Sequence, residues 1–229
     1  AGYTERRDTS LHALALAYSA IGLNRRALRM ELALLASPQY SERRGAGEIM
    51  AAAEIHVLLR DVEGARRWRD ATAHLNERLH DSGLSWHVAW IDANIAAVEG
   101  DWRAMRRHAL AAIALARDDL EGSDRIVSLS RLATAERMLG HPKRALAASQ
   151  QAIAALDARE SAALPGTYSA AQVLWAHRQA LLAAGRSDEA LRVLERAYRI
   201  VCKTIANVGD EGLRRCSFAH VGPHRKIIA

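Results

Sequence analysis

A turn recurs five times along this chain at a nearly constant spacing. At each recurrence a helical stretch rich in small residues ends beside the turn, and an amphipathic stretch with an early Ala follows. The turns centre on Gly22, Arg60, Gly100, Gly140 and Gly185, so the spacings are 38, 40, 40 and 45 residues. Self-similarity with a period of about 20–50 residues is typical of stacked structural units. The sequence therefore predicts a repeat architecture, which constrains the fold far more than the activity.

Composition favours helix throughout the chain. Of its 229 residues, 50% are hydrophobic, 25% are charged and only 5% are aromatic, and there are four prolines. Strong helix formers such as Ala, Leu and Arg recur everywhere, while β-branched and turn-rich stretches are few. An all-α fold is expected, large enough to bury a core.

The sequence also suggests a compartment. No run of about 18 or more apolar residues occurs, and the polar first residues do not resemble a secretory signal. Cys202 and Cys216 make no disulfide framework and fit a reducing environment. We expect a cytoplasmic protein without a membrane span. The chain starts without an initiator Met, so a fragment of a longer protein is expected.

Periodicity and turn residues predict five helix pairs. Each pair forms a helical hairpin that cannot bury its apolar stripe alone, so neighbouring hairpins must stack. The predicted helices cover residues 9–21 and 24–37, 46–59 and 62–79, 84–98 and 102–117, 124–138 and 142–157, and 168–183 and 187–205. A single superhelical domain over 1–229 follows, with units near 8–41, 46–80, 84–118, 124–158 and 168–205, and a C-terminal cap or tail over 206–229.

The repeat resembles the tetratricopeptide repeat (TPR). Residues typical of that unit are best matched in the first repeat, by Leu11, Leu14, Ala15, Tyr18, Gly22 and Ala27, and in the fifth, by Gly185, Ala190, Leu194 and Ala197. The resemblance covers nearly the whole chain. It implies a right-handed α-solenoid of about five antiparallel helix pairs that binds a protein or peptide.

Small residues mark where the two helices of each unit should cross. Ala27, Ala65, Ala145 and Ala190 occupy that position, where a methyl group lets two backbones approach closely. Two units depart from the pattern. Arg60 replaces the turn glycine of the second, and Met105 replaces the crossing Ala of the third, which leaves their register open.

The unit length and the tail suggest a narrower resemblance. Units near 40 residues are similar to the sensor arrays of bacterial MalT/LuxR-type regulators and of cyclase-associated signalling proteins. The last residues, GDEGLRRCSFAHVGPHRKIIA, resemble the segment that closes such arrays. That resemblance implies the regulatory or sensor module of a bacterial signalling or transcription regulator, with other domains of the same protein as possible partners.

The first helices of a helical solenoid line its concave face. Amide, guanidinium and indole groups there can bind the main chain or a carboxylate of an extended peptide. We expect a groove that contains His87, Trp90, Asn94, Ser130, Arg131, Thr134, Arg137, Gln172, Trp175 and Gln179. Two alternatives stay open. The two Trp side chains could simply fill space between hairpins, and Arg131 and Arg137 could be surface charges paired with Glu136 or Asp124.

Other chemistries have weaker support. The net charge of +6 invites nucleic-acid binding, but arginine pairs such as Arg66-Arg67 are interleaved with acids, which favours a solvated face. Cys216, His220 and His224 recur every four residues, yet Gly222 and Pro223 interrupt the helix and a fourth zinc ligand is lacking. No catalytic or phosphate-binding motif occurs. We expect no cofactor, no metal and no enzymatic activity.

The sequence therefore predicts a non-catalytic protein- or peptide-binding scaffold or sensor. An inducer bound in the superhelix cavity is the main alternative, and nucleic-acid binding through the basic surface is a weaker one. Self-association into a homo-oligomer is compatible with exposed terminal hairpins.

Overall fold

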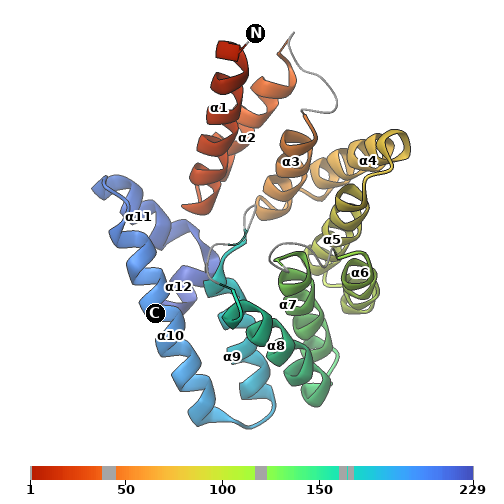
Figure 1. Ribbon diagram of the computed structural model, residues 1–229. Coiled ribbons are helices and arrows are strands. Elements are labelled where there is room, and N and C mark those ends of the chain that lie inside the picture. Colours follow the sequence, from red (N-terminus) through yellow and green to blue (C-terminus); the bar gives the residue numbers. More distant parts are fainter. Residues whose placement is uncertain (1, 38–44, 117–122, 160–163, 165–167, 229) are drawn as a thin grey trace.

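The computed structural model describes residues 2–37, 45–116, 123–159, 164 and 168–228, with side chains from Thr9 onward. Regular structure in these segments is entirely α-helical, which confirms the predicted fold class (Figure 1). Ten helices form five consecutive antiparallel pairs: α1 (Gly2–Ala20) and α2 (Asn24–Leu35), α3 (Ala46–Leu58) and α4 (Val62–Leu79), α5 (Ser82–Glu99) and α6 (Trp102–Leu115), α7 (Ser123–Met138) and α8 (Pro142–Asp157), and α9 (Ala170–Ala183) and α10 (Ser187–Ala206).

The helices match the predicted ranges to within two residues at most ends. The main difference is α1, which begins at Gly2, whereas the sequence predicted residue 9. The predicted unit ends at residues 41 and 118 lie outside the described residues. Helices α3, α5 and α7 follow the inner side of the curve, with α4 and α6 outside them (Figure 1).

All five hairpins turn through the same backbone conformation. The turn residue has a positive φ in each unit: 85° at Gly22, 78° at Gly100 and Gly140, 76° at Gly185, and 60° at Arg60. Glycine adopts this left-handed conformation without the steric cost that a Cβ brings. Arg60 adopts it all the same, so the second unit keeps the register of the others.

The crossing positions are buried as the sequence predicted. Ala27, Ala65 and Ala145 are inaccessible to solvent, and Ala190 is almost so. Met105 is also fully buried, against Ala96 and Ala135. The third unit therefore holds a larger side chain at the point where the others hold a methyl group.

Ion pairs join the second helix of one unit to the first helix of the next. Arg69 of α4 donates two hydrogen bonds to Asp92 of α5, at 2.9 and 2.8 Å. Arg106 of α6 donates to Glu136 of α7 at 2.6 Å, and His141 contacts the other oxygen of that carboxylate at 2.7 Å. Burial acts to raise the pKa of Glu136, but the bonds to Arg106 and His141 outweigh it and lower the pKa. Part of the arginine-rich surface thus connects neighbouring hairpins.

The C-terminal tail forms two further helices, α11 (Glu211–His220) and α12 (Gly222–Ile228). Helix α12 packs against α9 and α10, where Ile227 joins a core cluster with Leu174 and Val201. Where α11 ends, just before α12, His220 lies against Gly22 of the first turn. The last helices therefore contact the first unit as well as the fifth.

Within the described residues, none of the helices combines the length and the apolar character that a membrane crossing requires.

Candidate functional site

Equivalent positions of the repeat bring side chains to the inner face of the curve. Ten residues before the turn stand His12, Met50, Trp90, Ser130 and Trp175, one in each unit. Helical periodicity places these residues at the same angle on their respective first helices. The structure nevertheless gives them three different environments: an acidic chamber, a buried aromatic row and a basic groove.

The basic groove lies between α7 and α9. Its cavity has a volume of about 230 Å³. Six of the ten predicted site residues line it: Arg131, Thr134 and Arg137 from α7, and Gln172, Trp175 and Gln179 from α9. Tyr168 and, from the tail helix α12, Pro223 and Lys226 complete most of its wall. Three cationic side chains and no acidic one appear among its described lining residues.

Aromatic rings orient the guanidinium groups near the groove. The guanidinium of Arg131 lies over the Tyr168 ring, 5.2 Å from its centroid, and that of Arg178 lies 4.9 Å from the centroid of Trp175. Nε of Arg131 is buried and makes no hydrogen bond. Because buried polar atoms are normally hydrogen-bonded, this N–H group is a candidate donor for a ligand. Stacked guanidinium groups can bind carboxylates through paired hydrogen bonds.

The acidic chamber is the larger cavity, about 690 Å³, and lies between the first helices of units one to four. Its polar lining consists of His12 from α1, Glu54 from α3, His87 from α5, Ser123 and Asp124 from α7, and Asp81, which precedes α5. No Lys or Arg occurs among its described lining residues. Only His87 of the predicted site residues lines it.

A histidine and a buried carboxylate are paired beside this chamber. Nδ1 of His12 lies 3.0 Å from both carboxylate oxygens of Glu31, which is fully buried. The hydrogen bond to Glu31 raises the pKa of His12 above 6.5, while Glu48 and Glu54 add attraction. Burial raises the pKa of Glu31 above 4.5 in spite of the His12 contact. The pair therefore holds its proton more strongly than either free group would.

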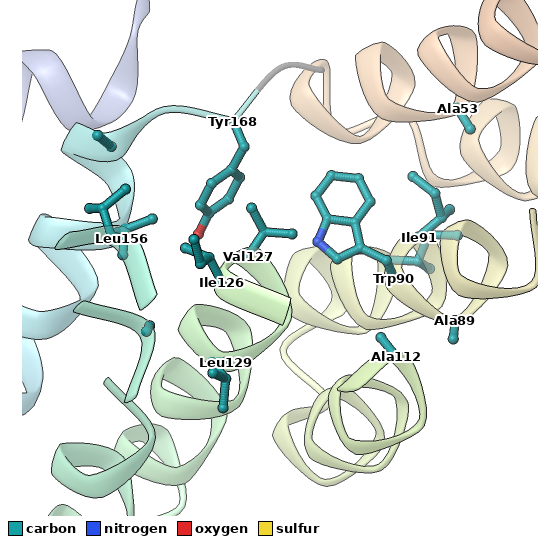
Figure 2. Close-up of a cluster of buried hydrophobic side chains, with 14 of the residues drawn as sticks. Ala53, Ala89, Trp90, Ile91, Ala112, Ile126, Val127, Leu129, Leu156 and Tyr168 are labelled. Carbon is teal, nitrogen blue, oxygen red and sulfur yellow. The ribbon is translucent and has the colours of Figure 1, made fainter. Parts of the chain in front are cut away.

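An aromatic row separates the chamber from the groove. Trp86 lines the chamber and stacks on Trp90 at 5.7 Å between ring centroids, and Trp90 meets the edge of Tyr168 at 6.4 Å. Figure 2 shows the side chains of Trp90 and Tyr168 next to each other in the buried cluster, with the side chain of Val127 between them. The connection that precedes α9 thus contributes a ring to the core of units three and four.

This arrangement buries three predicted site residues. Trp90 is 4% exposed and belongs to the largest core cluster, so it fills space between hairpins. Asn94 is buried and donates to the Trp90 carbonyl oxygen at 2.7 Å. Ser130 is buried and accepts a hydrogen bond from the Tyr168 hydroxyl at 3.2 Å. None of the three lines the basic groove or the acidic chamber.

The sequence left open that Arg131 and Arg137 form ion pairs with Glu136, and the structure does not show these pairs. That carboxylate bonds Arg106 and His141 instead. The sequence-based site also omitted Tyr168 and Lys226, for which no local signal exists because both arrive from segments outside the hairpins. It omitted His12 and Glu54 too, although their repeat positions, ten and six residues before the turn, could have identified them.

No group of three or more His, Cys, Asp or Glu side chains suited to a metal is present in the described part of the chain. The predicted interruption of the tail helix is confirmed, since α11 ends at His220 and α12 begins at Gly222. Nδ1 of His224 lies 3.2 Å from the Ser217 hydroxyl oxygen.

Comparison with known proteins identifies the fold. The chain is similar to the nearly identical TPR-like repeats of a putative kinesin light chain of Podosopora anserina. One structure of these repeats has a TM-score of 0.55 at 20% identity, and the match covers 87% of this chain and 97% of that one. A substituted form has a TM-score of 0.56 at 19% identity, and the match covers 89% of this chain and 98% of that one. A tetratricopeptide repeat protein from Parabacteroides merdae has a TM-score of 0.61 at 15% identity, covering 97% of this chain and 71% of that protein. No family model and no curated protein matches the sequence.

Proposed function

We propose that this TPR-like array is a peptide-binding module, and that its basic groove binds a carboxylate of an extended segment of a partner protein. One observation carries the proposal. Residues from two different first helices and from the tail converge on one small cavity whose described lining holds three cations and no acid. An anion entering this cavity would gain charge-assisted hydrogen bonds, which are stronger than neutral ones.

The composition of the groove suits a peptide. Gln172 and Gln179 carry both amide donors and acceptors, as the main chain of an extended peptide requires, although Gln172 also accepts from the Ser169 N–H at 2.8 Å. Trp175 is half-buried and adds apolar area with little loss of rotamer freedom. A volume of about 230 Å³ is smaller than typical small-molecule sites of about 300–1,000 Å³. It suits one side chain or a chain terminus.

The narrower proposal is that the module regulates a bacterial signalling or transcription protein. The repeat spacing near 40 residues and the similarity of the tail to segments that close such arrays support it. The tail also supplies Lys226 to the groove, so a partner bound there would contact the segment nearest the C-terminus. Such contact offers a way to couple binding to any domain that follows.

Nucleic-acid binding has less support. Arg66, Arg69 and Arg106 each bond a carboxylate of the next unit, and Arg196 bonds Asp157. These pairings reduce the positive charge available for phosphates, whose neutralisation dominates such binding.

The test is selection of peptides from a displayed library of random 12-residue sequences, followed by titration of the best peptide by fluorescence anisotropy. We expect the selected peptides to be enriched in Asp, Glu or a free C-terminal carboxylate. Arg137→Gln should weaken binding at least about 10-fold, because a hydrogen bond to a charged group contributes about 1.5–3 kcal/mol.

Arg107→Gln provides the matched control. Arg107 is an exposed arginine of α6 outside the groove, so its substitution should leave affinity unchanged. Circular dichroism would establish that both variants keep the parent's helicity. Selection without acidic enrichment, or equal affinity of the parent and Arg137→Gln, would show that the groove is not the peptide site.

A further inference from the structure

His87 is a polar side chain buried at the wall of the acidic chamber without a hydrogen bond. It is 1% exposed, and neither of its ring nitrogens has a hydrogen-bond partner. Nε2 lies 3.4 Å from a carboxylate oxygen of Glu54, close enough for an ion pair only if the ring is protonated. Buried polar groups in folded proteins are nearly always hydrogen-bonded. Because His87 lines the chamber, a ligand there can supply the absent partner.

The charge of the chamber is opposite to that of the whole chain. The protein carries 32 Lys and Arg against 26 Asp and Glu, yet the described lining of the chamber includes Glu54, Asp81 and Asp124 and no Lys or Arg. His12 and His87 are the other titratable groups of the described lining, and His12 is paired with Glu31. The charge of these carboxylates attracts a cation even where their oxygens already accept hydrogen bonds. That attraction is stronger in a partly enclosed site than in water.

Apolar side chains occupy the rest of the wall. Leu16, Met50, Leu84 and Trp86 contribute aliphatic and indole surface beside the carboxylates. The volume of about 690 Å³ lies within the range of small-molecule sites. A ligand that suits this chamber therefore combines a positive head with a short hydrocarbon part.

We infer that the acidic chamber is a second binding site, independent of the basic groove, and that it binds an organic cation of the alkylguanidine or alkylamine class. Glu54 and Asp124 attract the cationic head, an N–H group of the ligand donates to His87, and the alkyl part lies on Met50 and Trp86. This chemistry is shared by a free small cation and by the side chain of an arginine in a protein.

The chain carries built-in reporters for the test. It has five Trp residues, so a 15N-labelled sample gives five indole signals by nuclear magnetic resonance. Trp86 lines the chamber and donates its indole N–H to Ser128 at 3.1 Å, whereas Trp175 lines the basic groove. The probes are butylguanidine and its neutral isostere butylurea. We expect butylguanidine to shift the Trp86 signal saturably and to leave Trp175 unshifted, and we expect no saturable shift with butylurea.

Two variants separate charge recognition from a change in structure. Glu54→Gln, which keeps the side-chain volume, should weaken butylguanidine binding at least 10-fold while the melting temperature records whether the fold is kept. Asp124→Asn should weaken it as well, so that the test does not depend on one variant. Arg137→Gln, in the basic groove, should leave the titration unchanged.

A second pair of probes identifies the source of the cation. Acetylarginine methylamide carries the same head on a peptide-like backbone, and acetylcitrulline methylamide is its neutral counterpart. Tighter binding of the arginine compound than of butylguanidine would indicate a protein ligand, and the reverse order would indicate a free small molecule. Equal shifts with butylguanidine and butylurea, or parent-like titrations for both chamber variants, would overturn the inference. Neither of those results would alter the outcome for acidic peptides at the groove.

Discussion

The acidic chamber and the basic groove are built from the same positions of one repeat, yet they carry opposite charge. Glu54 stands six residues before the turn of the second unit, and Gln179 stands six residues before the turn of the fifth. Both face a cavity on the inner side of the array. The helical scaffold fixes where these side chains point but imposes little on their chemistry, because a carboxylate and an amide occupy the same position in two units. Recognition can therefore differ between two ends of one solenoid.

Tyr168 completes the aromatic row that forms the boundary between the two regions. Tyr168 contacts Trp90 and bonds Ser130, and it also lines the basic groove. Without it, Trp90 and Ser130 would lose these contacts, and only Trp86 and Trp90 of α5 would remain of the aromatic row. The separation thus depends on the connection before α9 as well as on the repeats themselves.

The largest expected effect tests this boundary at equivalent positions. Trp90 and Trp175 each stand ten residues before a turn, but the first is buried and the second is half-buried. Trp90→Ala should lower the free energy of unfolding by about 3–5 kcal/mol through loss of a packed core side chain. Trp175→Ala should cost less, about 1–2 kcal/mol, because the indole packs against the Leu174 cluster but is only partly buried. Urea denaturation of both variants measures the difference, and similar losses would mean that the two positions share one environment.

A smaller effect tests the contact between the two ends of the array. Gly22 and Gly140 have nearly the same φ, but a Cβ on Gly22 would lie 2.5 Å from Cβ of His220, whereas a Cβ on Gly140 would meet nothing within 4 Å. Gly140→Ala should cost about 1 kcal/mol from left-handed strain alone. Gly22→Ala should cost more, because α11 must also move. Thermal melts of the two variants check this order, and equal costs would argue against the contact of α11 with the first unit.

Most of the fold was predictable because its determinants are local. Gly140 and Gly185 stop a helix by backbone conformation, and the small side chain of Ala145 permits a close crossing, so each signal lies within a few residues of its effect. Arg60 looked like a departure in sequence, but it adopts the same turn. The hairpin is thus determined by the whole unit and not by one glycine.

The candidate site was only partly predictable for the opposite reason. Repeat register correctly grouped Arg131, Thr134 and Arg137 with the polar residues of α9. It could not indicate that Tyr168 would bury Ser130, which lies 38 positions earlier in the chain. Nor could it place Lys226, since the tail reaches α9 only through tertiary packing. Contacts from outside the repeat leave no trace in its periodicity.

Two histidines, His12 in the wall of the chamber and His177 on the side of α9 that contacts Ser149 of α8, should respond to pH in opposite ways. The pKa of His12, beside the chamber, is raised above 6.5 chiefly by its bond to Glu31. Its contribution to stability is therefore fully present below pH 6.5 and is lost as pH rises through the higher folded-state value. The pKa of His177, in α9, is lowered from 6.5 by burial, and Arg186 adds to the shift. Its contribution is present above pH 6.5 and is lost as pH falls through the lower folded-state value.

Melting temperatures between pH 5 and pH 9 would test this contrast. His12→Gln should flatten the decline of the melting temperature as pH rises above 6.5. His177→Gln should flatten its decline as pH falls below 6.5. The contrast would fail if His12→Gln flattened the melting temperature below pH 6.5, or if His177→Gln flattened it above pH 6.5. The two histidines would then not act through the environments described.

The smallest effect sharpens the comparison at the turns. Arg60, in the part of the array that forms the chamber, is the non-glycine residue among the five turn positions, and its φ of 60° is one that L side chains rarely adopt. Arg60→Gly should raise the free energy of unfolding by about 0.5–1 kcal/mol, because relief of strain exceeds the added freedom of the unfolded chain. Arg60→Ala, which keeps a Cβ and removes only the exposed 3.4 Å bond to the Val98 carbonyl oxygen, should not be stabilising. If both variants were stabilising to the same degree, the side chain and not the backbone conformation would be the source of the strain.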